Sequence, residues 1–324
     1  MSRRPPLGPL LRQLRPLRLR DAAPRGSLVQ GGVLSMTGLL AQGLLRFGTS
    51  WLVGRVAGRA ALGTVQTAIS TANLLALMGP TSTGSAASKY LARARGSGDE
   101  AELHGVASHL GRRAVLLTVV LAVAGVLFWV LYDEGTWVDG VCVGLFTAAY
   151  SGYSFTRGIQ FGTGQVVRAT TWDVLSAVGG IAALAAVLAT GARGGVLLLP
   201  LVLSYGAYTL ASWPRDVRRH APLDPALRRE LDHVIVLGVS GTLASAGFLQ
   251  IAMIVAKGTD PEGAGQFAAA MATATPASLL ATSLSLVLFP SLAEAWGRGD
   301  REQFADQTDR AARVLMVVMV TIFG

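Results

Sequence analysis

The sequence contains one cysteine and four histidines, and only 15% of its 324 residues are charged, whereas 51% are apolar. A lone cysteine, Cys142, cannot form an intrachain disulfide, and no two histidines have H-x-x-x-H or H-E-x-x-H spacing. We therefore expect neither a bound metal nor a cofactor. The sequence also lacks a short apolar segment followed by a small-residue cleavage site, so its amino terminus does not resemble a cleaved signal peptide.

Long apolar stretches fill most of the chain. A helix that crosses hydrocarbon needs about 20 mostly apolar residues, because lipid offers no partners to unpaired backbone groups. A mean hydropathy of +0.48 is typical of a polytopic membrane protein. We predict an all-α transmembrane helix bundle with spans at 28–53, 63–88, 114–132, 138–156, 170–189, 196–213, 233–256, 264–292 and from 314 onward.

The positive charges lie mainly in alternate gaps between these spans. The amino-terminal tail and the gaps after the even-numbered spans hold 23 of the 28 Lys and Arg residues, the other gaps hold 4, and Arg46 lies inside the first span. This asymmetry places the tail and the basic gaps in the cytoplasm of a multi-pass cell-membrane protein. It also explains the net charge of +9 without a nucleic-acid partner. We expect the basic tail to contact anionic lipid headgroups.

Two pairs of segments repeat in the same orientation. Residues 33–48 resemble 236–250, and 96–103 (GSGDEAEL) resemble 297–304 (GRGDREQF), at nearly equal offsets. We predict two parallel six-helix lobes, the second one incomplete, with three more spans expected beyond Gly324. The predicted organisation is a cytoplasmic tail (1–27), a first lobe (28–213), a cytoplasmic linker (214–232) and a partial second lobe (233–324).

The second and eighth spans are rich in Ser and Thr, and the second also contains Gln66 and Asn73. Such residues either line a water-filled cavity or hold neighbouring helices together. Pro80 and Pro276 interrupt these two spans and are candidates for a gate that opens by helix bending, or for static kinks. They do not align at the repeat offset, which weakens the case for a symmetric gate.

Two ionisable residues within spans are functional candidates. Arg46, with Gln42 one turn earlier, either faces the bundle interior, where it would attract an anionic group, or extends to the outer headgroups. Asp173 could bind a proton or cation, although pairing with Arg168 or Arg157 is the favoured alternative.

Several motifs carry a resemblance to a known family. They are an RGS segment before the first span, Arg55 and Gly58 after it, Gly63 at the start of the second span, the KYLA sequence at 89–92 with a Gly/Asp loop, and FPSLAEAWGRGDREQF in the second half. The chain resembles the multidrug/oligosaccharidyl-lipid/polysaccharide (MOP) flippase superfamily, in particular its polysaccharide-transporter branch, which exports O-antigen or teichoic-acid precursors.

The resemblance implies a non-enzymatic transporter of 12 or 14 spans that moves lipid-linked sugars from the inner to the outer leaflet by alternating access. Its substrate would be of the polyprenyl-diphosphate type, with polysaccharide assembly enzymes as further partners. Spans 1, 2, 7 and 8 would line the cavity, and they contain the predicted substrate-binding residues Arg46, Gln42, Gln66, Asn73 and Gln250.

Two alternative functions remain. A cation-coupled multidrug exporter of the same superfamily would need buried carboxylates, and Asp173 is the candidate that the sequence offers. A membrane-embedded glycosyl- or acyltransferase would need an acidic pair or a buried histidine near a leaflet. The sequence favours it less, because its histidines lie in or beside predicted cytoplasmic loops.

Overall fold

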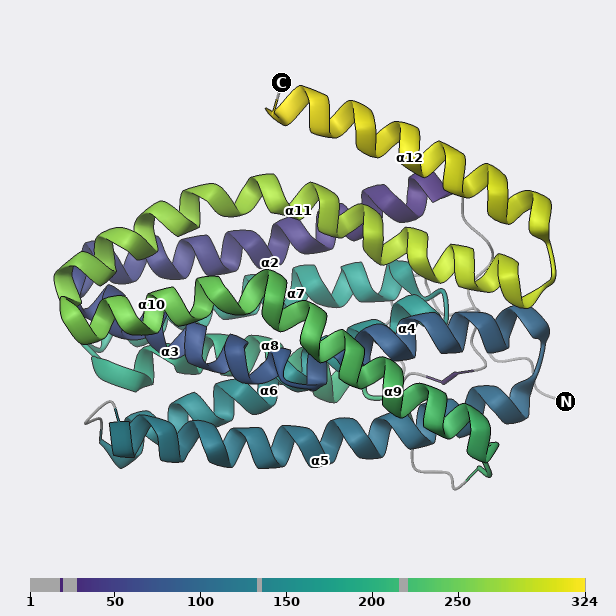
Figure 1. Cartoon of the computed structure of the whole chain (residues 1–324). Coiled ribbons are helices and arrows are strands. Elements are labelled where there is room, and N and C mark those ends of the chain that lie inside the picture. Colours follow the sequence, from purple (N-terminus) through teal and green to yellow (C-terminus); the bar gives the residue numbers. More distant parts are fainter. Residues whose placement is uncertain (1–17, 20–27, 133–135, 216–220, 324) are drawn as a thin grey trace, which may run out of the picture.

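The computed structural model describes residues 18–19, 28–132, 136–215 and 221–323. Within these ranges it describes only the backbone of 28–29, 259, 261–262, 272–284, 314–315 and 317–323. These residues form eleven α-helices, most of them running along one common direction (Figure 1). The bounds are α2 Leu28–Val56, α3 Arg59–Leu77, α4 Pro80–Ser97, α5 Glu100–Tyr132, α6 Trp137–Gly162, α7 Val166–Ala189, α8 Leu199–Ser212, α9 Pro225–Thr242, α10 Phe248–Thr259, α11 Pro261–Gly297 and α12 Arg301–Phe323. A 3₁₀ turn, η1 (Gly194–Leu198), precedes α8, and a π-helical turn, η3 (Leu243–Gly247), joins α9 to α10.

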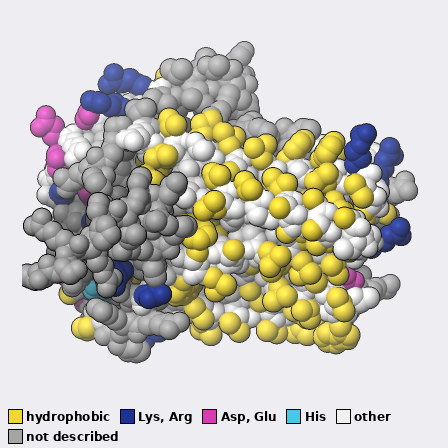
Figure 2. All heavy atoms as spheres, turned by 180° about the vertical axis from the view of Figure 1, so that it is seen from behind, with side chains coloured by type: hydrophobic (Ala, Val, Ile, Leu, Met, Phe, Trp, Pro, Cys, Tyr) yellow, Lys and Arg dark blue, Asp and Glu magenta, His cyan; other side chains and the backbone are white. Residues whose placement is uncertain are grey.

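The outer surface is apolar in the middle and charged towards the ends. On α5, one helical face exposes Val115, Leu116, Val119, Val120 and Val123. Figure 2 shows hydrophobic side chains spread as a broad band, with Lys and Arg gathered towards its two ends. A soluble monomer rarely exposes an apolar surface of this extent, whereas lipid accommodates it.

Among the described residues, five helical segments are long and apolar enough to cross a membrane by length and composition: Arg59–Leu77, Glu100–Leu131, Val166–Ala189, Gly194–Ser212 and Pro225–Gly258. They correspond to five of the nine predicted spans. The predicted spans that begin at 28, 138, 264 and 314 form α2, α6, α11 and α12. These helices are long as well, but within the described residues they are not among the five, so their crossing of the membrane stays a prediction.

The second predicted span is not one helix, which corrects the sequence interpretation. Helix α3 ends at Leu77, and α4 begins at Pro80. Pro80 has no N–H to continue the hydrogen-bond ladder, and it occupies the first turn of α4, where helices tolerate proline. By contrast, α11 passes through Pro276 without a break, and the side chain of Pro276 lies outside the described residues.

The positive charges after the fourth predicted span also need correction. Arg157 and Arg168 were assigned to a cytoplasmic gap, but α6 extends to Gly162 and α7 begins at Val166, so both arginines lie within helices and are buried. The turn between these two helices is short. Two of the 23 charges assigned to the inner face therefore belong to the interior of the bundle.

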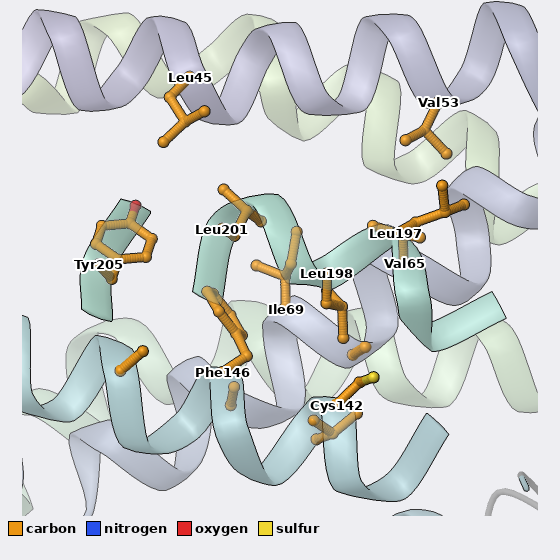
Figure 3. Close-up of a cluster of buried hydrophobic side chains, with 14 of the residues drawn as sticks. Leu45, Val53, Val65, Ile69, Cys142, Phe146, Leu197, Leu198, Leu201 and Tyr205 are labelled. Atoms are coloured by element: carbon orange, nitrogen blue, oxygen red, sulfur yellow. The ribbon is translucent and has the colours of Figure 1, made fainter. Parts of the chain in front are cut away.

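The main hydrophobic cluster lies between α2, α3, α6 and α8. Leu45 of α2 and Ile69 of α3 pack with Phe146 of α6 and with Leu201 and Tyr205 of α8 (Figure 3). Glycine lets α4 and α6 approach closely: a Cβ added at Gly84 would lie 2.6 Å from the Ser154 carbonyl oxygen, and one added at Gly158 would overlap the Gly84 carbonyl. These contacts fix the positions of the helices that carry the polar residues described next.

Candidate functional site

A fully buried carboxylate lies inside the first predicted lobe. Asp173 on α7 accepts a hydrogen bond from Tyr153 Oη at 2.9 Å and forms an ion pair with Arg157 Nε at 3.1 Å. Opposite it, α2 presents Gly38, where an added Cβ would lie 2.5 Å from Asp173 Oδ2, so the absence of a side chain there makes room for the carboxylate. Arg157 was one of the two partners predicted for Asp173. The other, Arg168, donates instead to the Ala211 carbonyl oxygen at 3.1 Å.

Gln42 ties α2 to this centre. Its Nε2 donates to the Asp173 carbonyl oxygen and to Ser176 Oγ, both at 2.9 Å. Gln42 is buried, and the two bonds hold α2 and α7 in register. The sequence singled out Gln42 and Asp173 for different roles, substrate binding and ion coupling, whereas the fold places them in contact with one another.

Arg46 turns inward, one helical turn beyond Gln42. Its Nε donates to Tyr205 Oη at 2.8 Å, and its guanidinium carbon lies 4.8 Å from the ring centre of Tyr150. Within the described part of the chain, no carboxylate lies close enough to Arg46 to form an ion pair. The side chain therefore does not extend to the outer headgroups. Hydroxyl and ring contacts stabilise it, but its positive charge is not neutralised.

The structure divides the other predicted substrate-binding residues between two further places. Gln66 on α3 accepts a hydrogen bond of 3.4 Å from Ser50 on α2, one turn beyond Arg46. Asn73 on α3 donates to Gln250 on α10 at 3.5 Å, close to the π-helical turn. Arg46 and Gln42 thus belong to the interior of the first predicted lobe, whereas Asn73 and Gln250 bridge the two predicted lobes.

Sequence reasoning missed an aromatic and polar face of α6. Tyr150, Tyr153, Arg157 and Gln160 recur at helical spacing, and Tyr205 and Tyr208 of α8 lie against them. Tyr208 donates a hydrogen bond to Gln160 Oε1. The spacing of three or four residues from 150 to 160 carried the signal, but the predicted span ended at 156 and left Arg157 and Gln160 outside it.

Several buried polar atoms in this region have no hydrogen-bond partner among the described residues. They include a guanidinium nitrogen of Arg157 (Nη2), the amide nitrogen of Gln160 and the amide oxygen of Gln42. Burying such groups unpaired is costly, so they are suited to binding water or a polar ligand group. The charged side chains in and beside this polar core are Arg46, Arg157, Arg168 and Asp173, so positive charges outnumber negative ones.

Comparison with known proteins identifies the fold. No protein-family model and no curated protein sequence matches the chain. Among solved structures, a MOP superfamily transporter from Pyrococcus furiosus, described as having a binding pocket of reversed polarity, has a TM-score of 0.69 at 18% identity, covering 91% of this chain and 70% of that one. The chain has the all-α fold of MOP superfamily transporters.

Two further structures agree. An outward-facing multidrug-resistance MATE transporter of the MOP superfamily gives a TM-score of 0.69 at 18% identity, covering 91% of this chain and 70% of the other. A MATE structure in a straight conformation gives a TM-score of 0.71 at 16% identity with the same coverage. At this level of identity the likeness establishes the fold and leaves substrate and residue roles to be argued from the chain itself.

Proposed function

We propose that this chain is a multi-pass transporter of the cell membrane that moves a lipid-linked sugar, carried on a polyprenyl diphosphate, from the inner to the outer leaflet by alternating access. The hydrated sugar and diphosphate cannot cross hydrocarbon unshielded, whereas a polar interior can cover them while the isoprenoid tail stays in lipid. The transporter fold and the inward-facing polar residues of α2, α3, α6 and α10 support this proposal. The proposal assigns the chain to the polysaccharide-transporter branch, with its amino terminus in the cytoplasm.

The observation that carries the proposal is the inward position of Arg46 without a carboxylate partner. A guanidinium is a strong ligand for phosphate oxygens, and an uncompensated one inside a membrane protein favours an anionic group. Tyr150 and Tyr205 hold this guanidinium in place by ring contacts and one hydrogen bond. Arg157 adds a second positive charge, which Asp173 balances in this conformation.

A leaflet-exchange assay tests the role of Arg46. In proteoliposomes containing a fluorescent polyprenyl-diphosphate disaccharide, the parent protein should expose the probe to a membrane-impermeant quencher. Arg46→Ala should slow exchange about 10- to 100-fold, since a charge-assisted hydrogen bond is worth about 1.5–3 kcal/mol. Arg55→Ala is the matched control, because Arg55 lies at the end of the same helix and is exposed. Unchanged exchange in Arg46→Ala would refute the proposal.

A cation-coupled multidrug exporter is the second candidate, and the buried carboxylate of Asp173 favours it. Coupling would require Asp173 to exchange its pairing with Arg157 for a proton or cation. In that case Asp173→Asn should abolish proton-driven efflux of a cationic dye such as ethidium, while Arg46→Ala should leave it intact. If the chain is instead a flippase, Arg46→Ala should slow exchange of the lipid-linked sugar, and the parent protein should not export the dye.

A further inference from the structure

Two turns at one end of the bundle have the same geometry. The α4–α5 turn and the α11–α12 turn lie at the same end in Figure 1. Each contains a glycine with positive φ, 74° at Gly98 and 75° at Gly299, a conformation that favours glycine. In each, the next residue is an aspartate whose side chain caps the following helix: Asp99 accepts from the Glu102 N–H at 2.9 Å, and Asp300 from the Gln303 N–H at 3.0 Å.

The helices that lead into these turns contact each other reciprocally. A Cβ added at Gly96 of α4 would overlap the carbonyl group of Glu294 on α11, and one added at Gly297 would overlap the carbonyl group of Arg93 on α4. Residue 96 corresponds to 297, and 93 to 294, at one common offset. The same contact is therefore made twice in opposite senses, as in an interface between two copies related by a two-fold axis.

An ion pair flanks this glycine contact. Arg95 on α4 pairs with Glu294 on α11, which also pairs with Arg298 Nη1 at 2.7 Å. Side-chain exposures of 22% for Arg95 and 13% for Glu294 put the pair at the edge of the interface, where water can reach the separated charges. Such a pair adds attraction between the helices without the large desolvation cost of a fully buried one.

Further polar contacts join the first predicted lobe to α9 at this end of the bundle. Tyr90 of α4 donates to Glu230 at 2.7 Å, and burial together with this bond raises the pKa of the Tyr90 hydroxyl. Asp232 of α9 bonds His109 at 3.0 Å and Arg113 at 2.9 Å, both on α5. At this end of the bundle, polar side chains therefore connect the first predicted lobe to α9, and backbone atoms alone form the glycine contact between α4 and α11.

We propose that the Gly96–Gly297 contact and the Arg95–Glu294 pair form a latch that holds this end of the bundle closed and separates when the transporter opens to this side. The inference rests on the proposed transport function. Glycine surfaces carry no interlocking side chains, so α4 and α11 can part as rigid bodies, and the partly buried charges regain water as they do. The reciprocal geometry lets both helices tilt by the same movement.

Spin-label distance measurements test the latch without any substrate. Labels are placed at Ala101 and Glu302, exposed residues at equivalent positions just beyond the two turns, after replacing the native cysteine by Cys142→Ala. We expect Glu294→Gln to increase the ratio of a longer-distance population to the short one about three- to tenfold, as loss of a partly buried ion pair implies. Asp306→Asn is the control, because it removes the exposed Arg310–Asp306 pair within α12.

A second variant and a cross-link distinguish a latch that opens from a contact that only packs the helices together. Gly297→Ala should also increase the longer-distance population, whereas Gly206→Ala, at a helical glycine with open space around it, should not. In unlabelled protein with Cys142→Ala, a disulfide between Arg95→Cys and Glu294→Cys should stop exchange of the lipid-linked sugar until it is reduced.

The latch is overturned if the distance distribution stays single and unchanged in both Glu294→Gln and Gly297→Ala, or if the cross-linked protein exchanges the probe at the rate of the reduced one. If the parent protein moves no lipid-linked sugar, the proposed function fails, while the distance distributions still decide the latch.

Discussion

The buried pair of Arg157 and Asp173 gives the sharpest stability prediction. The Asp173 side chain is fully buried, and that of Arg157 is 7% exposed. Asp173→Ala would leave the guanidinium buried without its counter-charge and would remove the acceptor for Tyr153. Breaking a buried pair in this way costs about 3–5 kcal/mol, whereas replacing both members by apolar residues is often close to neutral. We expect Asp173→Ala to be strongly destabilising, and Arg157→Met/Asp173→Leu to recover most of the loss.

Thermal unfolding in detergent, followed by the fraction of protein that stays monodisperse, measures this effect. A loss of that size should lower the apparent Tm by roughly 6–20 °C, taking about 2–4 °C per kcal/mol for a large domain. Asp306→Ala is the control, because the Arg310–Asp306 pair has side chains 72% and 50% exposed and should change the Tm by about 2 °C at most. A Tm for Asp173→Ala within 2 °C of the parent would refute the reasoning, as would a double variant less stable than the single one.

Two further predictions concern packing and topology. Gly158→Ala should lower the apparent Tm by several degrees, because its Cβ would overlap the Gly84 backbone. Gly206→Ala, at a glycine with open space around it, should leave the Tm unchanged. Equal stability of the two variants would contradict this prediction and would show that α4 and α6 can move apart at no cost. In intact cells with Cys142→Ala, a cysteine at Thr190 should react with an impermeant maleimide added outside, and one at Ser97 should react only after permeabilisation. Labelling of both from outside would contradict the predicted orientation.

The helices themselves could be predicted from the sequence because lipid-facing segments must be long and apolar. Their ends could not be predicted as well. Helix α5 begins at Glu100, well before the predicted start at 114, because Asp99 caps its first turn and a more polar segment continues the helix beyond the apolar stretch. Apolar length alone also cannot show whether Pro80 kinks one helix or begins a new one, as it does at the start of α4.

The candidate site was predicted only in part, for a physical reason. Arg46, Gln42 and Asp173 stood out because charged and amide groups are costly within a span, and the structure finds all three turned inward. Arg157 was predicted as a partner of Asp173 but was placed in a cytoplasmic gap, because an arginine near the end of an apolar stretch ordinarily reaches water. Tyr205 was not predicted as a site residue. Aromatic residues at helical spacing usually indicate packing, and the spacing does not reveal which group will hydrogen-bond to a tyrosine hydroxyl.

The charge balance of this interior is the strongest guide to the substrate. A single arginine at the centre of a membrane helix costs about 2.5–3.5 kcal/mol on insertion scales. This bundle turns Arg46 inward and buries Arg157 and Arg168. Asp173 neutralises one of them. An interior built for cationic drugs would need the opposite sign, because an uncompensated guanidinium repels a cation at short range in a medium of low dielectric constant. The positive charge that remains on Arg46, held against Tyr150 and Tyr205, therefore favours an anionic substrate headgroup such as a diphosphate.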